Sequence, residues 1–347
     1  MHRRQGTFDT AASLRAHFRR STFTTEQAEQ SGISARRLGR AEQAGYVVRL
    51  RRGLYMLADP VIAQPVHPDQ AHPEPSQPDQ ASMDLAVARQ RVEQLRGGGI
   101  PAVVGEETAA AAWGLPHDRL IVPTIHVPRG STVHLGTRHG VRVRERDVDD
   151  VITFRGVPMT SPLATARDLC RGLPRHRAIA LFGLAQRRQA EWLLSGDDRM
   201  AASDLTQALS DAAWRAELNE AMRRMLTSSP RRWPWCNSAD PRPETYLEAI
   251  SWGRLTGWNL GAMRPQAWVH GASGRPYRVD VLIDGVAGEA DGAIKYAAGD
   301  TLWKEKRRQE DIEEGGTPVV RWTFSDVEHH PEQLRERWRR ALSRHAA

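Results

Sequence analysis

The sequence predicts a mixed α/β protein built from several domains, and three observations lead to this prediction. The chain has 347 residues, a length typical of two or three domains. Apolar residues at helical spacing alternate along it with short Val- and Ile-rich runs that are typical of strands. Two proline-rich stretches, residues 59–82 and 227–242, separate three longer segments. We therefore expect domains at residues 1–58, 83–226 and 243–347.

The first domain has the order of elements of a winged helix-turn-helix. Residues 11–18 carry apolar side chains at helical spacing, and residues 24–27, Thr-Thr-Glu-Gln, form a capping-box signature that opens a second helix. Residues 34–44 predict a third helix, which begins after a serine cap. Residues 46–57 alternate apolar and basic side chains around an Arg-Gly pair, a pattern typical of a β-hairpin wing.

Arginines gather on two parts of this domain that would face DNA. A recognition helix enters the major groove, while wing side chains reach phosphates or the minor groove. The third helix and the wing each contribute three candidates, namely Arg36, Arg37, Arg40, Arg49, Arg51 and Arg52. The alternative is a winged helix that binds another protein and keeps its basic face in solvent.

The motif Arg-Leu-Arg-Arg-Gly-Leu-Tyr at residues 49–55 resembles the N-terminal domain of AbiEi-type abortive-infection antitoxins. Segment 83–226 is similar to the second domain of the same proteins. The resemblance implies that the N-terminal domain binds promoter DNA and that the protein has a toxin partner.

Composition favours a polyanionic partner in a reducing compartment. Lys and Arg number 49 against 42 Asp and Glu, a net charge of +7 and an isoelectric point near 10.0. Two cysteines supply neither a disulfide framework nor a zinc site. The basic N-terminus lacks a following apolar segment, and no run of about 18 apolar residues occurs. We expect a cytoplasmic protein with neither a secretory signal nor a membrane span.

The middle segment follows a proline-rich tether and predicts an α/β domain without a catalytic constellation. Residues 59–82 lack the large apolar side chains that a core requires. Beyond them, helices are expected at 85–95, 106–113 and 161–170, and strands at 125–127, 141–144 and 151–154. Its arginines either extend a DNA-facing surface or lie in solvent; they are Arg142, Arg144, Arg146, Arg155, Arg167 and Arg171.

The third domain is organised around an Asp-Gly pair, Asp284-Gly285, between apolar residues. This is the strongest short-range signal for a two-residue type I′ hairpin. The turn places Asp280 directly opposite Glu289, and strand alternation places Asp291 on the same face.

Opposed carboxylates have Cβ atoms roughly 5 Å apart and destabilise a sheet unless a proton or cation intervenes. A divalent ion with oxygen ligands, Mg²⁺ or Mn²⁺, removes the conflict. The alternative is an acidic hairpin face that lies in solvent.

The same residues resemble the PD-(D/E)xK restriction-endonuclease-like superfamily, and within it the very-short-patch-repair-like group. The likeness rests on Asp280, the Glu-x-Asp-Gly motif at 289–292, a Lys-Arg-Arg-Gln-Glu helix and the strand Pro318–Phe324. It implies a restriction-endonuclease-like α/β domain in which a bound metal activates water against a phosphodiester. The resemblance makes Asp280 and Glu289 metal ligands, and Asp291 a third ligand or the holder of the attacking water.

Three further residues enter through this resemblance. Glu244 matches the acidic residue on the first helix that completes such sites. Asp291 stands where the general motif has lysine, so the lysine's role falls to Lys295 or to Arg307.

The helix expected at 302–314 either supplies cations to the scissile strand or is an amphipathic surface helix. Its candidates are Lys304, Arg307 and Arg308.

Three functions are consistent with these patterns. The first is a DNA-binding, metal-dependent endonuclease acting on duplex DNA in phage defence or repair. The second is a non-catalytic, antitoxin-like transcriptional regulator with a degenerate nuclease domain. The third is RNA cleavage, which a duplex-reading helix disfavours because A-form grooves do not admit it.

Overall fold

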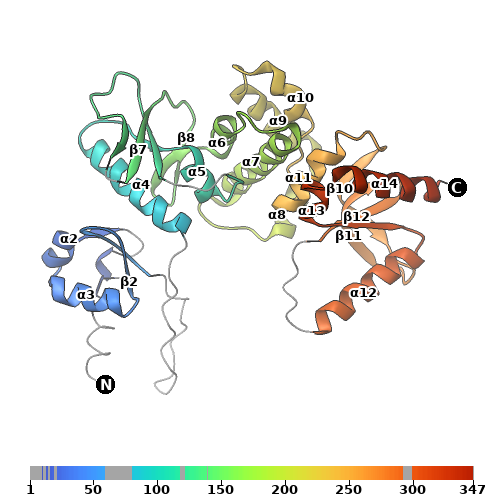
Figure 1. The fold of residues 1–347 in the computed structure, drawn as a ribbon, viewed down its shortest axis with the longest axis horizontal. Coiled ribbons are helices and arrows are strands. Elements are labelled where there is room, and N and C mark those ends of the chain that lie inside the picture. Colours follow the sequence, from blue (N-terminus) through green and yellow to red (C-terminus); the bar gives the residue numbers. More distant parts are fainter. Residues whose placement is uncertain are drawn as a thin grey trace. The chain divides into compact units, whose positions relative to one another are not determined.

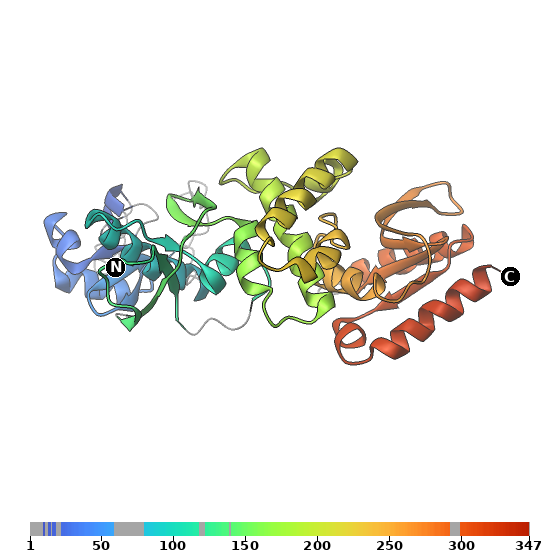
Figure 2. The same ribbon diagram turned by 90° about the horizontal axis from the view of Figure 1, so that it is seen from above.

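The computed structural model describes residues 22–58, 80–117, 122–138, 140–291 and 299–346, with residues 10, 13–14 and 16–18 (Figure 1, Figure 2). The chain divides into two compact units, Met1–Thr160 and Ser161–Ala347. This division falls inside segment 83–226, for which the sequence predicts a single domain. Of the tether predicted at 59–82, residues 59–79 lie outside the described residues, and residues 80–82 belong to a helix and not to a linker.

The winged helix-turn-helix elements form as predicted. Helices α2 (Thr25–Gln30) and α3 (Ala35–Gln43) precede the wing strands β2 (Val47–Arg51) and β3 (Leu54–Leu57). A short strand β1 (Phe23–Thr24) completes a three-stranded sheet of order β1-β3-β2. The predicted capping box is present, with the Thr24 hydroxyl and the Gln27 side chain each accepting the other residue's N–H.

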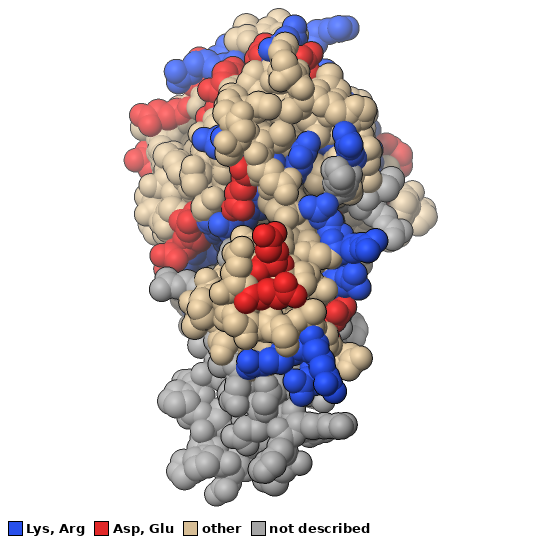
Figure 3. Space-filling model, turned by 90° about the vertical axis from the view of Figure 1, so that its left-hand side faces the viewer, with Lys and Arg blue, Asp and Glu red and all other residues tan. Residues whose placement is uncertain are grey.

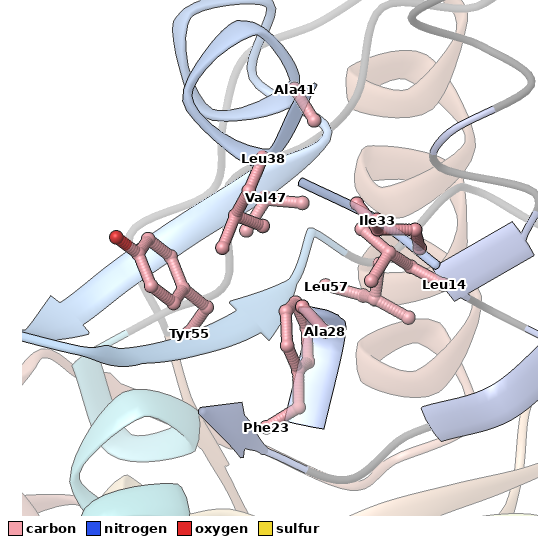
Figure 4. Close-up of a cluster of buried hydrophobic side chains, with 9 residues drawn as sticks. All are labelled: Leu14, Phe23, Ala28, Ile33, Leu38, Ala41, Val47, Tyr55 and Leu57. Atoms are coloured by element: carbon pink, nitrogen blue, oxygen red, sulfur yellow. The ribbon is translucent and has the colours of Figure 1, made fainter. Parts of the chain in front are cut away.

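One apolar cluster holds the first helix, α2, α3 and the wing together (Figure 4). Leu14 of the first helix, Leu38 of α3 and Val47 of β2 are each at most 2% exposed. Phe23 stacks between Phe18 and Tyr55. Burial of this cluster fixes the outer face of α3 relative to the wing.

The rest of the first unit is a six-stranded mixed sheet with two helices. Its order is β6-β7-β5-β4-β9-β8, and the three strands β4, β6 and β9 were not predicted from the sequence. The elements are α4 (Gln80–Gly97), β4 (Val103–Val104), α5 (Glu106–Trp113), β5 (Thr124–Val127), β6 (Gly136–Arg138), β7 (Val141–Glu145), β8 (Val151–Phe154) and β9 (Val157–Thr160).

The second unit begins with helices packed around the long helix α7. Gly253 of α11 allows a close approach to α7, because a Cβ atom there would lie 2.2 Å from the carbonyl oxygen of His176. The segment predicted as a connector carries η1 and α10 and belongs to this unit. The helices are α6 (Pro162–Leu169), α7 (Arg175–Ser195), α8 (Ala202–Ala208), α9 (Ala212–Met225), η1 (Pro230–Arg232), α10 (Trp233–Asn237) and α11 (Tyr246–Leu255).

A four-stranded sheet follows, in the predicted order of one helix, three strands, a helix and a strand. The strand order is β10-β11-β12-β13, with antiparallel pairing except between the parallel β12 and β13. The elements are β10 (Met263–His270), β11 (Pro276–Ile283), β12 (Val286–Ala290), α12 (Gly299–Glu314), β13 (Val319–Trp322), α13 (Phe324–Glu328) and α14 (Pro331–His345).

The last strand is shorter than predicted. It ends at Trp322, because the Thr323 side chain caps a new helix and accepts the N–H of Asp326. Phe324, assigned to the strand by its apolar character, therefore begins α13 and is 43% exposed.

Helices α12 and α14 cover opposite faces of this sheet (Figure 1). Ile312 of α12 packs against Ala287 of β12. A Cβ atom on the neighbouring Gly288 would lie 2.6 Å from the Trp338 ring of α14. Since successive strand residues point to opposite faces, the two helices enclose the sheet from both sides.

Candidate functional sites

The predicted hairpin is present with the predicted register. Asp284 and Gly285 both have positive φ, 42° and 85°, as a type I′ turn requires. The ladder pairs Ile283 with Val286 and continues to Val281 opposite Gly288. The turn therefore brings Asp280 of β11 and Glu289 of β12 to the same part of the sheet.

Beyond that point a side chain replaces the ladder. The Asp280 carboxylate accepts the main-chain N–H of Ala290 at 2.7 Å. This hydrogen bond holds the end of β12 against β11, so one oxygen of Asp280 has a structural partner.

Glu289 is bound by an arginine. Its Oε1 lies 2.8 Å from Nη2 of Arg308 on α12, and the same guanidinium donates to the carbonyl oxygen of Arg278 at 2.7 Å. Arg308 was a predicted DNA contact, but its side chain lies over the sheet and is only 24% exposed. Its position is better explained as the internal cation of the acidic cluster.

The sequence analysis missed Glu248, which is the third acid of this cluster. It accepts the N–H of Glu244 and the amide of Gln266, each at 2.8 Å, and the Thr245 hydroxyl at 2.8 Å. The pattern Thr245-x-x-Glu248 was a visible signal, because threonine three residues before glutamate marks a capping box.

The other two predicted acids also have arginine partners. Oε1 of Glu244 lies 2.8 Å from Arg278 and accepts the Thr206 hydroxyl at 2.7 Å. Asp291 lies 3.8 Å from Arg321. Both carboxylates therefore have an arginine as ion-pair partner, although only Glu244 is within hydrogen-bond distance of its partner.

The cluster shifts the pKa values of its carboxyl groups upward. Burial raises the pKa of Glu289 to about 7, and the charge of Asp280 adds to the rise against the opposing effect of Arg308. Burial together with Asp280 likewise raises the pKa of Glu248 to about 7. The pKa of Asp280 is raised by burial, and that of Asp291 by burial as well. The three clustered acids therefore carry less than three full charges at neutral pH.

This arrangement does not fit a bound divalent ion. Across the described ranges, no three side chains of His, Cys, Asp or Glu are grouped so that one metal ion could bind them. Glu289 is already paired with Arg308, which a metal ion would have to displace from that oxygen. Both oxygens of Glu248 already accept hydrogen bonds from the protein. The predicted Mg²⁺ or Mn²⁺ therefore finds no support in these residues.

Three further residues were predicted for this site. Lys295 lies outside the described residues, and so does the side chain of Lys304. Arg307 on α12 is exposed.

The predicted DNA-contacting arginines divide into two groups. Arg36 and Arg40 of α3, and Arg49 and Arg52 of the wing, are exposed, and no ion pair or hydrogen bond joins them to the part of the chain that the structure describes. Two others have partners in the same unit. Arg37 donates to the Thr10 hydroxyl at 3.2 Å, and Arg51 donates to the Gln90 side chain of α4.

Figure 3 shows the left-hand side of Figure 1, where a run of basic side chains lies to the right of a central group of acidic ones. Four unpaired guanidinium groups on a helix and its adjoining wing form a surface with positive potential, which attracts a polyanion.

Residues 13–58 match the family model described as "Transcriptional regulator, AbiEi antitoxin". The match spans the helices and the wing that carry the four exposed arginines. It agrees with the resemblance inferred from the wing motif and does not extend to the acidic cluster.

Two uncharacterised proteins of Mycobacterium tuberculosis are similar to a longer part of the chain. They are MT2308 of strain CDC 1551 / Oshkosh and Rv2248 of strain ATCC 25618 / H37Rv. Each is 26% identical over 265 residues, which cover 75% of this chain and 88% of the relative.

None of the described helices combines the length and the apolar character needed to cross a bilayer.

Proposed function

We propose that the protein is a DNA-binding transcriptional regulator of the antitoxin type. Its C-terminal domain is then a binding module that does not cut nucleic acid. One observation carries the proposal: the segment that matches the AbiEi antitoxin family presents four exposed arginines on α3 and the wing. Such a regulator binds the DNA upstream of its own coding sequence. It also implies a toxin as a protein partner.

The placement of the arginines supports a division of roles in this contact. Arg36 and Arg40 lie four residues apart on α3 and so share one helix face. We infer that this face enters the major groove. Arg49 and Arg52 of the wing then reach the phosphates.

Binding of a fluorescent duplex from this upstream region, measured by anisotropy, tests the proposal. Arg36→Ala and Arg40→Ala should each weaken binding to the upstream duplex by about 1–3 kcal/mol, while binding to a scrambled duplex changes less. Arg52→Ala should weaken both and lower the salt dependence by about one phosphate contact. Arg339→Ala, on the exposed face of α14, is the matched control. Equal affinity of all four variants would reject the proposal.

One observation favours a second function, metal-dependent phosphodiester hydrolysis. Burial and the repulsion of Asp280 raise the pKa of Glu289, and a cation at the cluster would relieve that repulsion. The order of elements in the C-terminal domain also agrees with the restriction-endonuclease-like resemblance. We favour the non-catalytic proposal because Arg308 already supplies a cation to Glu289. Calorimetric titration with Mg²⁺ distinguishes the two, since carboxylate-dependent heat is expected only for the hydrolase.

A further inference from the structure

Strand β13 has an open edge. It is the last strand of the sheet, and its parallel pairing sets Val320 opposite Gly288 and Trp322 opposite Ala290. The hydrogen bond from the N–H of Asp291 to the carbonyl oxygen of Trp322 shows which main-chain groups pair. The main-chain N–H and C=O groups of the even-numbered residues of β13 point toward β12. The N–H and C=O groups of Val319 and Arg321 therefore point away from the sheet, and no described residue hydrogen-bonds to them.

This edge forms the floor of a groove between two helices. The groove has a volume of about 830 Å³, with α12 contributing Gln309 and Glu313 to one wall and α14 contributing Arg340 and Arg344 to the other. A four-residue strand with two outward residues offers two N–H donors and two C=O acceptors along this floor.

The groove has free positive charge on its α14 wall. Arg340 and Arg344 are four residues apart on one helix face, are exposed, and have no acidic partner among the residues that the structure describes. Arg321 and Arg337, by contrast, are paired with Glu305 and Asp326 respectively. The free arginines call for an acidic occupant.

The chemistry of the edge selects among acidic occupants. A phosphate backbone accepts hydrogen bonds and so would satisfy the N–H groups of Val319 and Arg321, but it offers no donors to their C=O groups. A second copy of this chain would bring its own Arg340 and Arg344 into the groove, and like charges oppose that pairing. An extended polypeptide supplies N–H and C=O groups in alternation, as strand addition to a sheet edge requires.

We propose that the β13 edge groove binds an extended acidic peptide segment of a partner protein, which adds a fifth strand beside β13. Main-chain hydrogen bonds to Val319 and Arg321 provide the register, and Arg340 and Arg344 select carboxylate side chains. The inference goes beyond the proposed function and does not depend on DNA binding by the winged helix.

The experiment uses the full chain and a fluorescein-labelled octapeptide of alternating valine and glutamate, followed by anisotropy at physiological salt. Two matched peptides separate the contributions. A valine–lysine octapeptide tests charge selection, and the glutamate peptide with N-methylated valine amides tests main-chain pairing. We expect both to bind at least about tenfold more weakly than the parent peptide, which corresponds to about 1.4 kcal/mol.

Two protein variants test the arginine wall. Arg340→Glu and Arg344→Glu should each weaken peptide binding about tenfold, whereas Arg339→Glu, the same change beside the groove, should leave it within about twofold. All three positions are exposed, so the fold should tolerate the changes. Deuterium uptake by residues 317–322 should slow in the presence of the parent peptide, because the outward N–H groups become hydrogen-bonded.

Three results would overturn the proposal. The first is equal binding of the glutamate, lysine and N-methylated peptides. The second is an arginine-dependent complex with a short duplex DNA that the peptide does not displace, which would make the groove a nucleic-acid contact. The third is concentration-dependent self-association abolished by Arg340→Glu, which would make a second copy the occupant. The Arg40→Ala variant separates this proposal from the proposed DNA binding. It should lose binding to the upstream DNA and bind the peptide as the natural protein does.

Discussion

The guanidinium of Arg308 lies 2.8 Å from Oε1 of Glu289, a residue that the sequence predicted as a metal ligand. An arginine is permanently charged, so this contact sets a fixed cation beside Glu289. The acidic cluster therefore contains a cation supplied by the protein itself.

Removing that arginine should destabilise the second unit in a pH-dependent way. At pH 8 Arg308→Met forces the buried Glu289 either to stay charged without its cation or to bind a proton from solution, at a cost of about 2 kcal/mol of unfolding free energy. At pH 5 Glu289 is protonated in the variant, so the loss should be much smaller. Urea unfolding at both pH values measures the difference, with Arg307→Met on the exposed face of α12 as the control. An equal loss at both pH values would show that packing, and not charge, accounts for the contact.

Asp280→Asn should lower the pKa values of Glu289 and Glu248. The charge of Asp280 contributes to the raised pKa, about 7, of both residues. Asparagine keeps a side-chain oxygen that can accept the N–H of Ala290, so the sheet should survive the substitution. Carbon-13 NMR titration of the two carboxyl groups provides the measurement, and Asp204→Asn on α8 is the control. Unchanged titration midpoints would mean that burial alone sets both pKa values.

The raised pKa values also set the direction of the stability profile. The folded state binds protons to Glu289 and Glu248 more tightly than the unfolded state does, whose glutamates titrate near 4.5. Their contribution to stability is therefore present below about pH 4.5 and is lost as the pH rises to about 7. The unfolding free energy of the Asp280→Asn variant should fall less than that of the natural protein across this window. A parallel fall in both proteins would contradict the coupling.

Gly288→Ala should be more destabilising than an ordinary glycine substitution in a strand. A Cβ atom there would lie 2.6 Å from the Trp338 ring and 2.7 Å from the Trp322 ring, both of which are buried. Overpacking of this kind costs about 1–3 kcal/mol. Urea unfolding measures the loss, and Gly98→Ala, where the nearest atom is 3.4 Å away, is the control. A loss below about 0.5 kcal/mol, the size of an ordinary surface substitution, would show that α14 moves aside freely.

The features that the sequence predicts well are those determined by a few neighbouring residues. The capping box at Thr24 and the turn at Asp284-Gly285 both form, because each depends on side chains within three positions of one another. The hairpin register followed from the turn alone. The short strands β4, β6 and β9 were missed because two to four residues carry too little periodicity to distinguish a strand from a loop.

Contacts between distant residues were not predictable in the same way. The pairing of Glu289 with Arg308 joins residues 19 positions apart through the packing of α12 on the sheet. The arginines of α12 all looked alike in the sequence, and packing alone distinguishes Arg308 from the exposed Arg307. The division of the chain after Thr160 likewise depends on how α7 packs against α11, which no local motif announces.

The most direct test of the account is one incubation of the full chain with labelled upstream duplex and Mg²⁺, resolved on a native and on a denaturing gel. We predict a retarded band on the native gel that Arg40→Ala weakens, together with intact strands on the denaturing gel. Strand cleavage that Asp280→Asn abolishes, or the absence of any retarded band, would contradict the central claim.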